Sequence, residues 1–359
     1  MNGQDSTASV TIKEKPSIRP CIYFNRFGSR ANNRMDSSNQ YSYRQNNIGF
    51  YVPLYTETWI KDDKISVSSI HILGGVDYIN YIPKFSFIDD TLRLSKFSTN
   101  LKLFWANGSK NVWFFQLSPF VSKQFNTVNK RYSSSTFTII YNRTVSEKFA
   151  YRLGITGNYT FGRFLPIPIL GLRIGKLDKI HANLQFPRNL SLEIPINKTI
   201  QISIFNKSFG GIYAISLKDT LRFNTEKRIL LGRYEILHGV QSNFKINNHF
   251  SLYVGLGFTN KRHLNFTFQN KLSENIIKDK NKIPPSLLVT FGFAIRIGKA
   301  KQHYNDSNMY NLFEMNTSMG SNHKDAGTYD TDIPTPSDSK IGTKKLQYKD
   351  VEDLITDEY

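Results

Sequence analysis

Polar and ionisable side chains recur at every second position of several segments whose intervening positions are apolar. On one face of extended segments, such side chains could line an enclosed path and select solutes by charge. They could equally pair with one another in a closed polar core. The candidate lumen-lining residues are His71, Asp77, Gln116, Arg152, Asn158, His181, Gln185, Glu193, Gln201, Arg233, Glu235, Gln241 and Arg296.

The cost of placing charge in lipid gives these side chains a direction. An arginine or lysine that faces lipid near the middle of a bilayer costs about 2–4 kcal/mol, so Arg152, Arg233 and Arg296 are expected to point inward. His71 and His181 are expected to form hydrogen bonds in the interior rather than to bind a metal ion.

Motifs of known catalytic chemistry are scarce. The sequence has no His-Glu-x-x-His motif, no cysteine pair and no Walker loop. Ser321 and His323 are residue types used by hydrolases, but they lie almost side by side in a polar tail, whereas that chemistry needs a fold to position them. We expect no enzymatic activity, no cofactor and no metal site. Cys21 is the only cysteine, which excludes a disulfide within the chain.

Strict alternation of apolar and small or polar residues is the main structural signal. Phe250, Leu252, Val254, Leu256 and Phe258 alternate with serine, tyrosine and glycine. Successive side chains of a strand point to opposite faces, so this period of two predicts a strand with one apolar face. The pattern recurs along the chain at lengths close to those that cross a bilayer, which favours a membrane-embedded barrel.

The alternation predicts fourteen strands, with twelve as the alternative, because an even number places both chain ends on the same side. Short turns alternate with longer connectors, which is typical of an outer-membrane barrel. The expected strands cover residues 20–27, 44–59, 65–81, 92–105, 111–122, 134–142, 149–161, 167–175, 180–186, 190–196, 199–216, 229–246, 250–268 and 286–297. The segments 20–27, 180–186 and 190–196 are the weakest of these.

A soluble β-sandwich would show the same alternation with its apolar face packed inward. Several segments exceed the usual 5–6 residues of soluble strands. Trp59, Trp105 and Trp113 lie near the ends of expected strands, where aromatic girdles lie in membrane barrels. We therefore predict an all-β fold, a transmembrane antiparallel up-and-down β-barrel.

Composition fits this prediction. Aromatic residues make up 14% of the 359 residues, while the mean hydropathy is only −0.39, as expected when half of each strand faces a polar interior. The net charge of +19 is unevenly placed, because residues 300–359 hold six lysines and eleven acidic residues. The basic residues lie at turns rather than along one stripe, so we expect no nucleic-acid partner. Anionic lipid headgroups, an anion-preferring pore or simple lysine-rich composition remain as explanations.

The chain divides into three parts. Residues 1–18 are predicted to be disordered, residues 19–299 to form the barrel, and residues 300–359 to be a polar, acidic, mostly disordered periplasmic tail. The tail ends in a short amphipathic piece with Val351, Leu354 and Ile355 as candidate partner-docking residues. No signal peptide is visible at the start, so a leader is taken to have been removed or the start to be misplaced.

Four short pieces carry a family resemblance. They are residues 50–55, 165–171, 184–192 and 208–213, which read FYVPLY, LPIPILG, LQFPRNLSL and SFGGIY. Their order resembles a family of Gram-negative outer-membrane β-barrel proteins of unknown function. The resemblance covers about residues 19–299 and implies the fold and a location in the bacterial outer membrane. It implies no reaction, and the long tail departs from the family pattern.

Two functions from different classes follow from a barrel of this size. The leading hypothesis is a porin-like or ligand-transport channel, because about fourteen strands enclose space that side chains alone do not fill. The alternative is a non-conducting barrel that anchors or assists an outer-membrane complex, with the tail docking a periplasmic or outer-membrane partner. Outer-membrane lipid is the expected surrounding in both cases.

Overall fold

The computed structural model describes residues 19–29, 41–61, 66–85, 92–108, 110–125, 131–160, 163–186, 189–197, 199–215, 229–268, 271–275 and 285–298. The described part is an antiparallel sheet that closes on itself. The proposed tail, with Val351, Leu354 and Ile355, and the segment 1–18 lie outside the described residues. No helix among the described residues is long and apolar enough to cross a membrane.

The strands of the first half are β1 (Cys21–Ser29), β2 (Tyr41–Lys61), β3 (Ser66–Phe85), β4 (Leu94–Asn107), β5 (Asn111–Gln124), β6 (Arg131–Ser146) and β7 (Phe149–Thr160). Those of the second half are β8 (Arg163–Ile174), β9 (His181–Phe186), β10 (Asn189–Pro195), β11 (Ile200–Ile215), β12 (Ile229–Lys245), β13 (Phe250–Phe268), β14 (Lys271–Asn275) and β15 (Ser286–Arg296).

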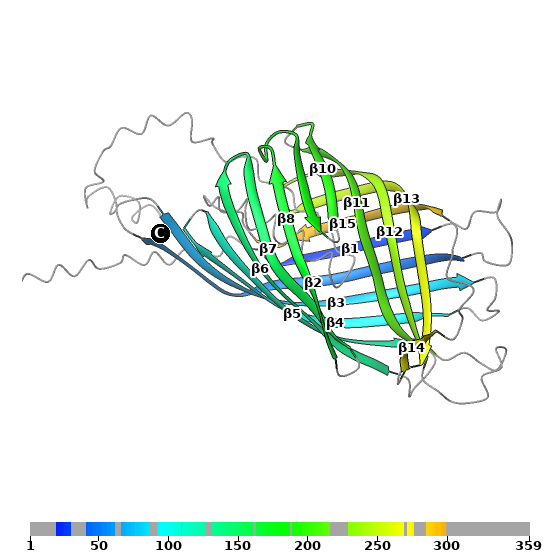
Figure 1. Cartoon of the computed structure of the whole chain (residues 1–359). Helices are drawn as coiled ribbons and strands as arrows, with labels where there is room; N and C mark the ends of the chain where they lie inside the picture. Colours follow the sequence, from blue (N-terminus) through cyan, green and yellow to red (C-terminus); the bar gives the residue numbers. More distant parts are fainter. Residues whose placement is uncertain are drawn as a thin grey trace, which may run out of the picture. The chain divides into compact units, whose positions relative to one another are not determined.

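Fourteen of these strands form the closed wall. Each pairs with its sequence neighbour, β13 pairs with β15, and β1 pairs with β15 to complete the ring. The short β14 pairs only with the last residues of β13 and lies in a stretch that the sequence predicted to be a connector. The predicted count of fourteen is confirmed, and the alternative of twelve is wrong. Figure 1 shows the ring from the side, with β1–β4 behind β11 and β12.

The two ends of the barrel differ. We call "turn end" the end at which β2–β3, β4–β5, β6–β7, β8–β9, β10–β11 and β12–β13 are joined, and "loop end" the opposite one. At the turn end, Asn197 and Asn247 each accept backbone N–H bonds from residues two and three positions on, which fixes both turns. The first and last strands meet there, because Ile297 N donates to Pro20 O at 2.9 Å.

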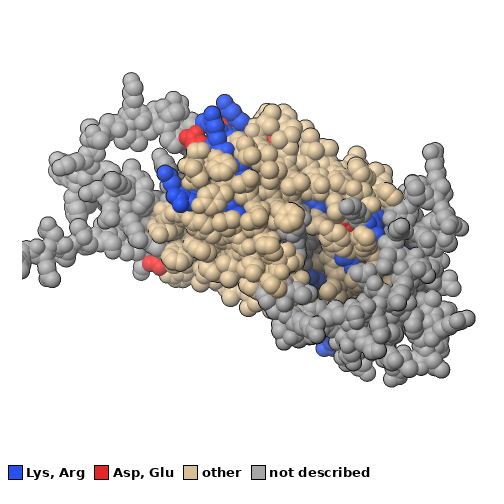
Figure 2. All heavy atoms as spheres, in the orientation of Figure 1, with Lys and Arg blue, Asp and Glu red and all other residues tan. Residues whose placement is uncertain are grey.

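Alternation sets which side chains face inward. On β1, Tyr23, Asn25 and Phe27 are buried, whereas Ile22 and Arg26 are exposed. The exposed side of the wall carries large apolar side chains on nearly every strand, such as Leu101 (50% exposed), Leu256 (59%) and Leu287 (59%). Figure 2 shows the near face as a broad uncharged band, with Lys, Arg, Asp and Glu toward its two ends. This is the reverse of a soluble domain, in which apolar residues are buried.

Tyrosine–glycine pairs recur on the inner face near the turn end. Tyr23 lies opposite Gly49, and Tyr253 lies opposite Gly292. A Cβ on either glycine would collide with the tyrosine ring of the neighbouring strand. The missing side chain therefore makes room for a ring that lies flat along the inner wall.

Candidate functional site: the barrel interior

The predicted interior residues all lie on the less exposed side of their strands. The buried ones are His71, Asp77, Arg152, His181, Gln185, Glu193, Arg233, Glu235 and Gln241. The half-buried ones are Gln116, Asn158, Gln201 and Arg296. Contacts between strands that are not neighbours in the wall show that this side is the interior. For example, the rings of Tyr81 on β3 and Tyr213 on β11 stack with centroids 5.1 Å apart.

A cluster of buried charges lies toward the loop end. The Glu235 carboxylate lies between two guanidinium groups, with Oε1 3.7 Å from Arg233 Nε and 3.6 Å from Arg262 Nε. The Tyr43 hydroxyl donates to Glu235 Oε2 at 3.3 Å. Arg262 donates to Tyr41 O and to Ser29 Oγ, both at 3.2 Å. All three charged side chains are at most 1% exposed. The negative charge of Glu235 therefore compensates the positive charges of Arg233 and Arg262 in a place that water does not reach.

Aromatic rings surround the guanidinium group of Arg233. Its Cζ lies 4.3 Å from the ring centroid of Tyr43, 4.6 Å from that of Tyr81 and 4.8 Å from that of Phe209. Stacking on aromatic faces is a favourable environment for a weakly hydrated guanidinium, especially away from water. We call this group of rings and charges, centred on Arg233, Glu235 and Arg262, the interior lock.

A second polar group surrounds Asp77 on β3. Its carboxylate accepts hydrogen bonds from Tyr23, from Tyr51 at 2.9 Å and from Asn100 Nδ2 at 2.6 Å. The side-chain oxygen Oδ1 of Asn100 in turn accepts a hydrogen bond from Ser118 Oγ at 2.6 Å. The donors stand on β1, β2 and β4, so one carboxylate links four neighbouring strands.

Several other predicted residues make local contacts with their neighbours. Glu193 accepts hydrogen bonds from Ser203 and, at 2.9 Å, from Gln201. Arg152 Nε donates to Asn142 Oδ1 at 3.0 Å. The rings of both histidines lie within hydrogen-bonding distance of oxygen: His71 Nδ1 is 3.3 Å from Thr56 Oγ1, and His181 Nδ1 is 2.9 Å from Lys179 O.

Opposite walls of the barrel approach each other. With strands about 4.8 Å apart and tilted by about 40°, an open fourteen-strand barrel measures roughly 28 Å across. Here Cα atoms of β11 come within 8 Å of Cα atoms of β4, β5 and β6, on the far side of the ring. Phe120 and Tyr132 from one wall pack in one buried apolar cluster with Ala214 and Leu230 from the other. The barrel is therefore pinched toward the loop end.

Positive charge dominates the interior. Among the described residues, the buried cationic side chains are Lys96, Lys102, Arg152, Arg173, Arg233 and Arg262, and the buried anionic ones are Asp77, Glu193 and Glu235. The excess of cations would favour an anion over a cation inside the barrel.

Sequence reasoning missed part of this site. Arg262 was not predicted to face inward, because the alternation of β13 placed it on the apolar side. The pairing of β12 with β13 skips Asn260, and this irregularity reverses the orientation of the residues that follow. Lys96, Lys102 and Arg173 occupy inward positions that the alternation could have revealed.

No grouping of three or more metal-binding side chains occurs among the described residues. A family model described as "Domain of unknown function (DUF6268)" matches residues 102–298, more than half of the chain. The chain belongs to this family. The predicted membership of a barrel family of unknown function is thereby confirmed for DUF6268, whose match spans the end of β4 and all of β5–β15.

Comparison with other proteins finds only distant likenesses. No curated protein matches the chain. The transport unit of the autotransporter AIDA-I from Escherichia coli is 12% identical, with a TM-score of 0.36 over 82% of this chain and 94% of that one. The translocator domain of NalP from Neisseria meningitidis is 6% identical, with a TM-score of 0.34 over 79% and 90%. A mutant of the TodX monoaromatic hydrocarbon channel is 8% identical, with a TM-score of 0.32 over 78% and 90%. At these TM-scores the likeness says nothing of what this member of DUF6268 does.

Proposed function

We propose that this DUF6268 protein is an integral β-barrel of the bacterial outer membrane. The exposed belt of apolar side chains supports this, because a closed sheet with an apolar exterior and a polar interior is suited to a bilayer. Trp105 and Trp113 form a directly opposed, exposed pair near the turn end, the position of an aromatic girdle.

We further propose that the barrel is closed and serves as an anchor or accessory subunit rather than as an open pore. The approach of β11 to β4–β6 within 8 Å carries this proposal, since an open path needs the walls well apart. The interior lock supports it, because its rings and charges fill the space beside the pinch. In this role the polar tail, through Val351, Leu354 and Ile355, docks a periplasmic or outer-membrane partner.

Transport is the second candidate. The excess of buried cationic side chains favours it, since a path lined in this way would suit an anionic solute. Such transport requires the side chains of the interior lock to separate and β11 to move away from β4–β6.

Liposomes separate the two candidates. The full chain is reconstituted into vesicles of uncharged lipid, and flotation in a density gradient reports insertion. Swelling in isotonic solutions of sugars and small organic anions then reports permeation. The closed barrel predicts insertion without swelling above empty liposomes. Swelling with anions but not sugars would support transport instead, and failure to float would overturn the membrane location itself.

A truncated chain that lacks residues 300–359 tests the docking role. The accessory role predicts that a partner recovered with the full chain after cross-linking in cells is lost with the truncated chain, while both insert equally. Recovery of the same partner with both chains would contradict docking through the tail.

A further inference from the structure

Exposed basic side chains gather at the loop end of one side of the barrel. We call them the basic rim: Arg26, Arg44, Lys84, Arg93, Lys123 and Arg131. Arg26, Arg44 and Lys84 lie on β1, β2 and β3. Arg93 directly precedes β4, and Lys123 and Arg131 lie on β5 and β6, so the rim follows six neighbouring strands. Each lies at an outward position of the alternation.

Strand register makes the rim continuous. Arg44 on β2 lies opposite Ile82 on β3, and Lys84 follows Ile82 by two residues on β3. The Arg93 carbonyl accepts a hydrogen bond from Phe125 N at 2.8 Å, which places Arg93 beside the end of β5. Lys123 lies directly opposite Arg131. The cations therefore occupy one band rather than scattered positions.

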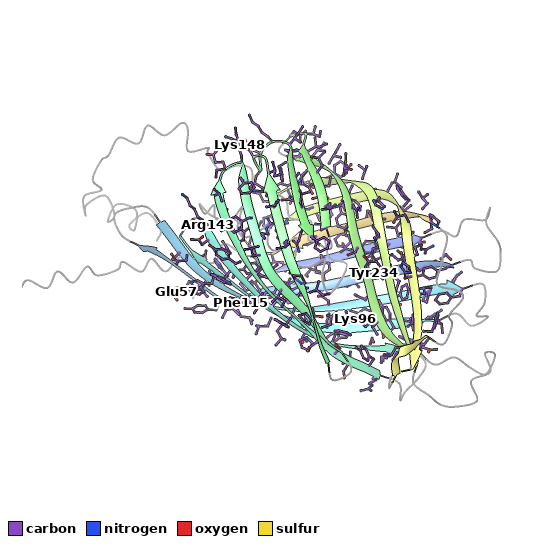
Figure 3. All side chains as sticks on the ribbon, in the orientation of Figure 1. Glu57, Lys96, Phe115, Arg143, Lys148 and Tyr234 are labelled. Atoms are coloured by element: carbon purple, nitrogen blue, oxygen red, sulfur yellow. The ribbon has the colours of Figure 1, made fainter. Side chains whose placement is uncertain are left out.

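Charge at the turn end has a different character. Glu147 and Asp178 are exposed there among lysines, and Lys176 pairs with Glu147 at 2.6 Å. Among side chains that the structure describes, none of the exposed acidic ones lies at the loop end. Figure 3 labels Lys148, Arg143 and Glu57 toward the turn end, and Tyr234 and Lys96 toward the loop end. The basic rim is thus a one-signed surface, whereas the turn end is mixed.

The apolar belt begins next to the rim. Val121 (39% exposed) lies two residues from Lys123, and Ile48 (49%) lies four residues from Arg44. At about 3.3 Å per residue, these separations place the cations some 7–13 Å along the strand from lipid-facing side chains. Cations at this distance from a hydrocarbon belt lie at the depth of lipid headgroups.

We infer that the basic rim binds phosphate groups of the lipid headgroups in the leaflet at the loop end. The inference rests on the membrane location proposed above and adds both a ligand and an orientation to it. Arginine matches phosphate with paired N–H donors and lysine supplies point charge. The side chains of the basic rim point outward from the barrel wall into the surrounding membrane and not into the interior. Lipid phosphates therefore meet these side chains, whereas a solute that passes through the barrel does not.

The test uses lipid A, a glycolipid with two phosphates, and the same lipid with its phosphates removed. Binding to the full chain in uncharged detergent is measured by titration. The rim variant carries Arg44→Gln, Lys84→Gln, Lys123→Gln and Arg131→Gln together. The matched control carries Lys110→Gln, Arg143→Gln, Lys148→Gln and Lys179→Gln, which removes the same charge from exposed positions at the turn end.

We expect the unmodified chain and the control to prefer the phosphorylated lipid, and the rim variant to bind it at least about tenfold more weakly. Equal binding of both lipids by the unmodified chain, or equal losses in the two variants, would overturn the inference. Inorganic phosphate as competitor separates a lipid site from a site for the free anion. Competition at low millimolar concentration would indicate the free anion and count against the lipid.

Two further measurements keep the outcome decisive. If the rim variant does not fold, as judged by the heat-dependent gel mobility of barrels, the salt dependence of the unmodified chain decides. Binding through several cations weakens steeply as salt rises, and binding indifferent to salt would overturn the rim. Flotation with uncharged vesicles shows which of the two proposals fails. A chain that floats but shows no preference for the phosphorylated lipid would refute the basic rim alone. A chain that does not float would refute the membrane location.

Discussion

Tyr43 on β2 donates a hydrogen bond to Glu235 on β12, with 3.3 Å between the two oxygens. Three strands, β1, β15 and β13, separate these two along the wall. A direct bond between them means that side chains from separate parts of the ring meet in the interior at this level. The same carboxylate lies between Arg233 and Arg262, so one acidic group joins the hydroxyl and both cations.

Replacing Glu235 tests the energetic role of the interior lock. Glu235→Gln leaves two buried guanidinium groups without their carboxylate, and breaking such buried pairs costs about 3–5 kcal/mol. Thermal unfolding in detergent, followed by circular dichroism, should show a clearly lowered midpoint. Glu147→Gln, at an exposed turn, is the matched control and should leave the midpoint nearly unchanged. Equal midpoints for both variants would mean that the lock does not stabilise the barrel.

The tyrosine–glycine pairs predict a strong effect of adding one methyl group. In Gly49→Ala the new Cβ would collide with the Tyr23 ring and the Asp77 carboxylate. Overpacking of this kind costs about 1–3 kcal/mol. Gly28→Ala is the control, because its Cβ would meet nothing within 4 Å. Denaturant unfolding of both variants should separate them, and a Gly49→Ala variant as stable as Gly28→Ala would contradict the packing described.

The lipid-facing belt predicts a depth-dependent cost for charge. Leu256 lies within β13 and Ile246 just after β12 at the turn end, and both are 59% exposed. In a bilayer, Leu256→Arg should cost about 2–4 kcal/mol and Ile246→Arg about 0–1 kcal/mol. Folding into liposomes from urea measures the difference. Similar costs for the two would indicate that the exposed apolar face does not lie in lipid.

The exposed ion pair at the turn end makes a prediction for pH. The hydrogen bond from Lys176 and its charge lower the pKa of Glu147 below its ordinary value. A lowered carboxyl pKa stabilises the fold above the unfolded pKa, and this contribution is lost as the pH falls through the folded pKa. Carbon NMR of the Glu147 carboxyl should show the low pKa, and Lys176→Gln should return it toward the ordinary range. An unchanged value in the variant would mean that Lys176 is not the cause.

Alternation, together with the requirement for an even number of strands, was enough to predict the wall. Apolar residues at every second position located the wall strands, and the even count retained the weak segment that became β1. Alternation also predicted which side of each strand carries residues such as Asp77, Arg152 and Glu235, because the pleat forces opposite faces on neighbouring residues. Strand ends were less exact: β2 and β3 extend beyond the predicted bounds at one or both ends.

The contents of the interior could not be predicted in the same way. Alternation states that Tyr43 and Tyr81 point to one face, but not that the ring of Phe209 or Tyr213 reaches them from the far wall. The high aromatic content fits the girdles of a membrane barrel, yet many aromatic rings pack inside this one. Fourteen strands leave an unfilled lumen only if the barrel has a round cross-section. The approach of β11 to β5 departs from that shape.

Single-channel recording of the full chain in a planar bilayer tests the closed interior most directly. Symmetric molar salt and a range of voltages are applied to the unmodified chain, with insertion verified by recovery of protein from the membrane. The closed barrel predicts a baseline without steady open levels. A reproducible, long-lived open level from the inserted, unmodified chain would contradict the closed interior.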